Sequence, residues 1–342
     1  MNHYGIWIGP DVELPGSDVC FPPVENGLDY LCSVVDLLVK QEGEAVSARD
    51  LKYAVLHLQA AAEVLLKARL QREHWSLVFK NPGSAVRSRF QAGDFESCTT
   101  PEAISRLRDV VGLPLKDKDV KALGSLAKSR NALQHYGLTA SGPATEARAA
   151  EVLDFLTSFL DEQLLEPLGK AELERIETHY MRRIRAGLSD VRSFVTKRMN
   201  RLKSRLDENS PRVITCPSCY QLALLVDGEA NKCHFCGIDG GVDVAVRVAR
   251  MESSFANVYT CPDCDVDAFV RNVHTAYDLG VPVDLCFNCN GDFEGFGECS
   301  ECRICSSIFH PDDRGADTCD ACLDEDHHSR MQSHYAMLER EG

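Results

Sequence analysis

The fold class follows from residues 50–75, which read DLKYAVLHLQAAAEVLLKARLQREHW. The apolar positions of this stretch recur at intervals of four, three, four and three residues: Leu51, Val55, Leu58, Ala62 and Leu65. This spacing places the side chains on one face of an α-helix, because the helix repeats about every 3.6 residues. Ser47, with Asp50 three residues later, is typical of a helix N-terminus. The stretch therefore predicts one member of a helical bundle.

Four further segments are predicted to be helical, and they are at about 25–40, 100–111, 117–136 and 144–166. Thr100 is expected to cap the second of them, with Pro101 at the first helical position. Gly137 is expected to end the third, and Pro167 with Gly169 the fourth. Residues 1–23 and 80–99 contain turn-forming Gly and Pro pairs, so we expect irregular structure there. Residues 1–168 are thus predicted to form an all-α helical bundle.

Residues 169–210 are predicted to form a long basic helix that connects the bundle to the rest of the chain. Between 170 and 206 there are 11 Lys and Arg against four acidic residues. Charge runs of this kind are usually solvated faces, and a solvated connector is one interpretation. The other is an arm for the phosphates of RNA, whose candidate residues are Arg182, Arg183, Arg185, Lys197, Arg198 and Arg201.

The 342 residues carry a net charge of −15, and almost all of it lies in the C-terminal region. Residues 211–342 hold 9 Lys and Arg against 23 Asp and Glu, a balance of −14, which makes this region a poor candidate for phosphate binding. No apolar run approaches the ~18–20 residues that a membrane span needs. The N-terminal residues lack the basic and apolar parts of a secretory signal. We therefore expect a cytoplasmic protein without a membrane partner.

Thirteen of the 16 cysteines lie between 216 and 322, almost all of them in Cys-x-x-Cys pairs. Without a secretory signal, such pairs indicate metal rather than disulfides. The pairs themselves come in twos, separated by 13, 21 and 13 residues. Four thiolates suit tetrahedral Zn²⁺ and leave it no open position for catalysis. The sequence therefore predicts three small, β-rich zinc ribbons with structural zinc, at 211–255, 256–297 and 298–342. The predicted ligands are Cys216, Cys219, Cys233, Cys236, Cys261, Cys264, Cys286, Cys289, Cys302, Cys305, Cys319 and Cys322.

The third zinc site has an alternative ligand, because Cys299 is left over. Cys299 could pair with Cys302 in place of Cys305, or it could bind no metal. Pairing Cys302 with Cys305 restores the 13-residue spacing of the first ribbon, which favours Cys305. Because the whole region is acidic, we expect the ribbons to bind a protein partner or to dock within the chain.

The helix predicted at 117–136 ends in the sequence KSRNALQHYG, residues 128–137. Its apolar stripe runs through Leu123, Leu126 and Leu133, and Arg130 occupies the position where another leucine is expected. A buried arginine is costly unless its charge is paired. The alternative is an arginine with a buried apolar stem and its guanidinium in water.

The neighbours of Arg130 suggest a chemical role for it. Asn131 and His135 are four residues apart and share one helix face, while His135 lies about 140° around the axis from Arg130. The three side chains together suit a phosphodiester. Arginine binds and neutralises phosphate, and histidine transfers protons near neutral pH.

The stretch from Arg130 to His135 resembles the motif of HEPN domains (higher eukaryotes and prokaryotes nucleotide-binding), in which arginine, four to six residues and histidine follow one another. Here four residues intervene, beginning with Asn131. The earlier stretch HLQAAAEVLLKARL also resembles the second helix of the family, with Glu63 and Lys67 at the expected places. The resemblance extends over residues 25–166, about 40% of the chain.

This resemblance implies a HEPN-like bundle and, as in many members, a metal-independent endoribonuclease of toxin–antitoxin, anti-phage or RNA-processing systems. It also implies a homodimer in which the motifs of two protomers face a shared cleft. Arg130 and His135 are then the catalytic residues, with Asn131 orienting the phosphate or holding His135. No cofactor is expected for catalysis.

Two supporting residues are suggested by their positions. Glu63 could pair with Arg130, and the alternative is a plain helix pair between Glu63 and Lys67. Tyr136 could line the cleft. Two other functions stay open on the sequence: an adaptor without catalysis, in which the bundle dimerises and the ribbons bind a protein, and a nucleic-acid-binding regulator that uses the basic helix.

Overall fold

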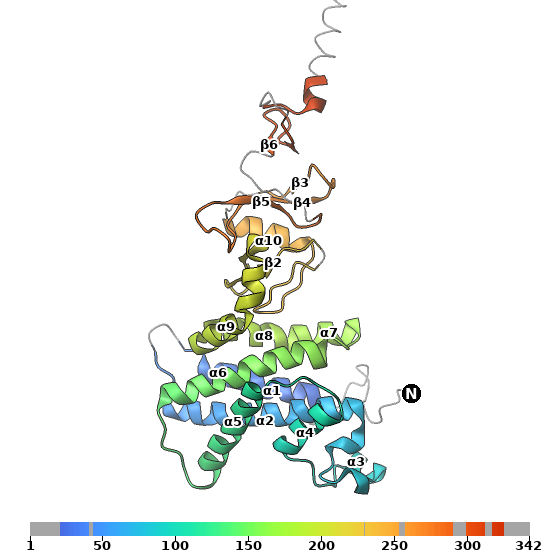
Figure 1. The fold of residues 1–342 in the computed structure, drawn as a ribbon, viewed down its shortest axis with the longest axis vertical. Coiled ribbons are helices and arrows are strands. Elements are labelled where there is room, and N and C mark those ends of the chain that lie inside the picture. Colours follow the sequence, from blue (N-terminus) through green and yellow to red (C-terminus); the bar gives the residue numbers. More distant parts are fainter. Residues whose placement is uncertain are drawn as a thin grey trace, which may run out of the picture. The chain divides into compact units, whose positions relative to one another are not determined.

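The computed structural model describes residues 21–40, 44–228, 230–252, 257–289, 299–311 and 317–324. The chain divides into two compact units, Met1–Asn200 and Arg201–Gly342. The first is helical, and the second holds small antiparallel sheets (Figure 1). A helical domain followed by small β modules is the predicted fold class. The expectation of irregular structure for residues 1–20 falls outside the described ranges.

The helix α2 is the centre of the first unit, because α1, α4, α5 and α6 all pack against it (Figure 1). Its predicted stripe, from Leu51 to Leu65, is confirmed as core, with exposed fractions between 0 and 8%. Ser47 caps it by accepting a hydrogen bond from the backbone N–H of Asp50. The described helices up to residue 190 are α1 (Pro23–Leu38), α2 (Ala48–Glu73), α3 (Arg87–Ala92), α4 (Thr100–Asp109), α5 (Asp117–His135), α6 (Gly142–Phe159), α7 (Lys170–Ile176) and α8 (Arg182–Asp190). None of the helices in the described ranges combines the length and the apolar character needed to cross a membrane.

The segment between α2 and α4 is more ordered than the loop that we expected at 80–99. It contains 3-10 turns at Trp75–Val78 and Pro82–Ser84, followed by α3. The reason is an aromatic cluster of its own, made of Trp75, Phe79, Phe90 and Phe95, in which the rings of Phe79 and Phe95 stack at 4.3 Å.

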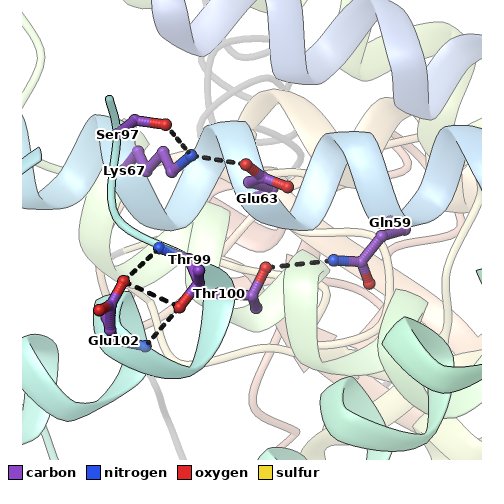
Figure 2. Close-up of polar contacts among 7 residues, drawn as sticks. All are labelled: Gln59, Glu63, Lys67, Ser97, Thr99, Thr100 and Glu102. Carbon is purple, nitrogen blue, oxygen red and sulfur yellow. Dashed lines mark hydrogen bonds and ion pairs between the residues drawn. The ribbon is translucent and has the colours of Figure 1, made fainter. Parts of the chain in front are cut away.

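The cap of α4 lies one residue earlier than predicted, because Thr99 and not Thr100 occupies the N-cap position (Figure 2). The Thr99 hydroxyl accepts from the backbone N–H of Glu102, and the carboxylate of Glu102 accepts from the backbone N–H of Thr99 at 2.7 Å. Thr100 is the first helical residue, and its buried Oγ1 accepts a hydrogen bond from Gln59 of α2. Thr99 therefore caps the first turn of α4, and Thr100 attaches α4 to the central helix α2.

The basic segment 169–210 is not the single long helix that we predicted. After α7 the chain makes a π-helical turn at Glu177–Met181 and continues as α8, and a new helix α9 (Arg192–Glu208) begins after Val191. Val191 is extended, with ψ 95°, and only 4% exposed. The helix breaks at this buried apolar residue, and charge counting along the segment did not reveal the break.

The second unit contains three small antiparallel sheets, which agrees with the expected β-rich modules. Its described elements are β1 (Val213–Thr215), β2 (Leu222–Leu225), α10 (Asp243–Glu252), β3 (Tyr259–Thr260), β4 (Asp267–Val273), β5 (Val283–Cys286), β6 (Ser300–Glu301) and β7 (Ile308–Phe309). The first two modules are joined by backbone pairing of Ile214 with Thr275 and by the buried Asn231, whose amide donates to the carbonyl of Phe287.

Candidate functional site

The helix α5 carries the predicted motif and buries one face in the bundle. The buried residues of that face are Asp119, Ala122, Leu123, Leu126, Ser129 and Ala132. Ser129 and Ala132 continue the face beyond Leu126, whereas Leu133 is only half-buried. Arg130 is half-buried at the edge of the face. Small side chains thus fill the place where we expected a leucine, and the arginine does not have to enter the core.

The guanidinium of Arg130 keeps most of its hydrogen-bonding capacity. Its Nη1 donates to Oδ1 of Asn131 over 2.9 Å. Within the described part of the chain this is its one hydrogen bond, and no carboxylate forms an ion pair with it. Because arginine has five N–H donors in a planar fork, several remain for an anionic or carbonyl group.

Arg130 also lines a pocket of about 170 Å³ in the helical unit. The other walls come from α1 and α2, and the residues that matter below are Asn26, Tyr30, Gln59, Ala60 and Glu63. Sequence reasoning found Glu63 and missed the rest. Gln59 could have been found, because it lies four residues before Glu63 on the same face. Asn26 and Tyr30 gave no signal, because they belong to another helix.

Glu63 pairs with Lys67 on α2 rather than with Arg130. The distance from Nζ of Lys67 to Oε1 of Glu63 is 2.5 Å, and the same ammonium donates to the hydroxyl of Ser97 over 2.8 Å (Figure 2). This is the helix pair that we named as the alternative. Glu63 nevertheless lines the same pocket as Arg130, so a ligand there can touch both side chains.

His135 is the last residue of α5 and is exposed. The helix ends directly after His135, because Gly137 is left-handed, with φ 95°, and donates its N–H to the carbonyl of Ala132. Tyr136 is 83% exposed and is not part of the pocket wall described above. Arg130, Asn131 and His135 thus occupy the last two turns of one helix, and the amide and the imidazole are open to solvent.

Two of the basic residues proposed for RNA, one buried and one half-buried, take part in an ionic network. Arg185 pairs with Glu177 at 2.5 Å and with Asp161 at 3.4 Å, and its side chain is 13% exposed. Arg198 is 5% exposed and lies 3.6 Å from Asp154 and 3.9 Å from Asp161. Buried charges of this kind need partners, so these two arginines hold α8 and α9 on the end of α6.

The other basic candidates are nearer the surface. In the first unit, Lys197 pairs with Glu151, Arg183 pairs with Asp36, and Arg182 donates a hydrogen bond to Thr178. Arg201 is half-buried and belongs to the second unit. Much of the positive charge of the segment is therefore neutralised by acidic residues of the helical unit.

The predicted zinc ligands form three groups of four cysteines, and in each group the sulfur atoms lie within 4.8 Å of one another. Measured Sγ–Sγ distances are 3.8 Å between Cys216 and Cys236 and 3.7 Å between Cys261 and Cys289. These values are far above the disulfide length of about 2 Å. They match the ~3.8 Å between ligands of a tetrahedral site with metal–sulfur bonds of about 2.3 Å. Each group can therefore hold a metal ion.

The leading cysteine pair of each group is held by the same backbone turn. The residue after the second cysteine is left-handed in all three, with φ 56° at Tyr220, 57° at Asp265 and 59° at Ser306. Its N–H donates to the carbonyl of the first cysteine over 2.8–3.0 Å. L-residues adopt this conformation rarely, so its threefold repetition marks Cys305, directly before Ser306, as the second cysteine of its pair.

The third group contains Cys305 and not Cys299. The backbone N–H groups of Cys305 and Cys319 lower the pKa of the Cys302 thiol to about 6, which favours the thiolate that binds metal. Sγ of Cys299 instead contacts Nδ1 of His310 at 3.9 Å. Nε2 of that histidine pairs with Asp263 of the second module at 2.7 Å.

Comparisons of this chain with protein-family models, with curated proteins and with solved structures found no match. What the molecule itself defines is a helical unit with a half-buried arginine beside a small pocket, and a second unit with three four-cysteine groups suited to metal.

Proposed function

We propose that this protein is a metal-independent endoribonuclease of the HEPN type. His135 acts as general base or acid at the ribose 2′-hydroxyl or the leaving 5′-oxygen. Arg130 stabilises the charge of the phosphorane-like transition state. Asn131 orients the phosphate or holds His135. The reaction leaves a 2′,3′-cyclic phosphate and a 5′-hydroxyl.

The environment of Arg130 is the observation that carries this proposal. An arginine that serves only the fold is expected to pair with carboxylates, as Arg185 and Arg198 do in the same unit. Arg130 has one hydrogen bond among the described residues, to Asn131, and it borders a pocket. Its charge is available to a phosphate, and the exposed His135 follows on the same helix.

A homodimer through the helical bundle is part of the proposal. Next to His135, Tyr136 is 83% exposed and Leu138 is 37% exposed. A second copy that covered these apolar side chains would bring two motifs together, as the resemblance implies. A toxin or anti-phage defence setting follows from the resemblance alone.

The three cysteine groups are proposed to bind structural Zn²⁺, since four thiolates and sulfur spacings of 3.6–3.8 Å suit that ion. They direct the enzyme to a protein partner. The negative balance of residues 211–342 supports a protein rather than RNA on that surface.

The direct test is an RNA cleavage assay with total RNA or tRNA. We expect wild type to cleave, His135→Ala to lose about 10²–10⁴ in rate and Arg130→Ala about 10²–10³. His179→Ala and Arg148→Ala are matched controls, because both side chains are exposed and lie outside the pocket wall; they should cleave like wild type. Intact RNA after incubation with folded wild type would contradict the proposal.

The second candidate is an adaptor without catalysis, and it too has a supporting observation. The second unit exposes large apolar side chains, namely Tyr277 at 76%, Tyr220 at 72% and Ile304 at 61%. Aromatic residues of this kind are enriched where proteins bind one another. The adaptor is favoured if RNA stays intact while the full-length protein captures a protein partner, and if Tyr277→Ser abolishes the capture but His135→Ala does not.

A further inference from the structure

The pocket beside Arg130 has the size of one aromatic ring. Its volume of about 170 Å³ is close to the ~150 Å³ of an engineered cavity that binds benzene. It is well below the ~300 Å³ at which sites for larger ligands begin. Tyr30 contributes an aromatic wall, and the small side chain of Ala60 leaves space open on the α2 side. A single-ring base fits this space, while its sugar and phosphate stay outside.

The polar groups of the pocket are divided into acceptors and donors. Glu63 uses one carboxylate oxygen for Lys67, and the structure gives the other no partner among the described residues. Gln59 is 5% exposed, its Nε2 donates to Thr100, and its Oε1 is buried without a partner in the described part of the chain. Arg130 can only donate. A ligand is therefore favoured if it donates toward α2 and accepts from α5.

We propose that this pocket binds a base of the RNA substrate next to the cleaved phosphodiester, and that it prefers cytosine to uracil. The inference rests on the proposed nuclease function. Cytosine offers its N4 amino group to the free carboxylate oxygen of Glu63 and its ring acceptors to Arg130. Uracil places a carbonyl oxygen where cytosine has the amino group, so it faces the carboxylate with like polarity. The remaining donors of Arg130 reach the adjoining phosphate.

The test compares two short RNAs that differ in one central base, cytosine or uracil, in an otherwise identical purine sequence. Wild type is expected to cleave beside cytosine with a kcat/KM at least about tenfold higher. Ala60→Leu fills the pocket and should remove this preference. Ala147→Leu is the matched control, because Ala147 is also a half-buried helical alanine but lies outside the pocket wall. Equal cleavage of the two RNAs by wild type overturns the inference, whether or not Ala60→Leu folds.

A binding measurement separates the failure of this inference from the failure of the nuclease. The same RNAs, labelled with a fluorophore, are titrated with His135→Ala protein and followed by anisotropy. Preferential binding of the cytosine RNA, lost in the double variant with Ala60→Leu, supports the pocket even if wild type cleaves nothing. Cleavage without a base preference supports the nuclease and overturns the pocket. Equal binding of the two RNAs, or no binding, also overturns it.

Discussion

Arg130 and Arg198 lie in the same helical unit, and they differ in burial and in the number of their partners. Arg198 is 5% exposed and is surrounded by Asp154, Asp161 and the hydroxyl of Ser158. Arg130 is half-buried and has only the amide of Asn131 as a partner among the described residues. Arg198 therefore serves the structure, and Arg130 is left for a ligand.

Replacing Arg198 should destabilise the protein strongly. We expect Arg198→Ala to lower the free energy of unfolding by about 3–5 kcal/mol, because it leaves Asp154 buried without its cation. Arg182→Ala, at an exposed position of the same basic segment, should change it by less than about 0.5 kcal/mol. Urea unfolding followed by circular dichroism measures both. An Arg198→Ala protein as stable as wild type but weaker in RNA binding would favour the phosphate-binding arm instead.

The two candidate ligands of the third metal site can be separated by single substitutions. Cys305→Ser should reduce the zinc bound per chain from about three ions to about two, because it removes one of four thiolates. Cys299→Ser should leave about three, because Cys299 lies outside the group. Native mass spectrometry counts the ions. The opposite pattern would assign the site to Cys299.

At the scale of single elements, the capping box of α4 predicts a pH dependence. The backbone N–H of Thr99, and then its hydroxyl, hold the pKa of Glu102 below its ordinary value. The carboxylate therefore stabilises the fold above its unfolded-state pKa of about 4.3, and this contribution is lost as the pH falls through the lower folded-state pKa.

The variant Glu102→Gln tests this cap. It should be less stable than wild type at about pH 6, and the difference should shrink as the pH falls below about 4.3 and through the lower folded-state pKa, because the protonated wild-type side chain loses its advantage. Thermal unfolding at several pH values measures the difference. A gap between the two proteins that stays constant over this range would show that the carboxylate charge does not contribute.

The elements differ in how far the sequence revealed them. The stripe of α2 and its cap at Ser47 were predictable, because helical periodicity and capping chemistry are local. The break at Val191 was not, because the segment has no glycine or proline there and its charge pattern continues unchanged across the break. The cap of α4 was predictable too, because Glu102 lies three residues after Thr99 and completes a capping box with it, whereas Thr100 has alanine at that spacing; choosing Thr100 overlooked this local signal.

At the scale of the whole molecule, the candidate sites also differ in whether the sequence could predict them. The four-cysteine groups were predictable, because Cys-x-x-Cys spacing is a local property of the sequence. In the structure each leading pair forms a tight turn, with a left-handed residue after Cys219, Cys264 and Cys305. The pocket was not, because its walls come from three helices far apart in the chain. Arg130 was named in advance from the interrupted stripe of its helix and Glu63 from its place on the second helix, and Gln59 could have been added from its spacing to Glu63.

Removal of the metal should affect the two units differently. A strong chelator is expected to unfold the region of the cysteine groups, because four free thiols cannot replace the bonds of the ion. The helical unit has its own buried core, so most of the far-ultraviolet helical signal and the RNA cleavage should remain. Thiol reactivity, circular dichroism and cleavage are measured on the same sample. Simultaneous loss of cleavage and of zinc would show that the second unit takes part in the reaction.

The most direct test of the account is the chemistry of the RNA ends after incubation in magnesium-free buffer. If Arg130 and His135 cleave RNA through the 2′-hydroxyl, mass spectrometry of the products will show 2′,3′-cyclic phosphates and 5′-hydroxyls. Both ends will disappear with Arg130→Ala and with His135→Ala. Uncleaved RNA, or ends with a 3′-hydroxyl and a 5′-phosphate, would contradict the account.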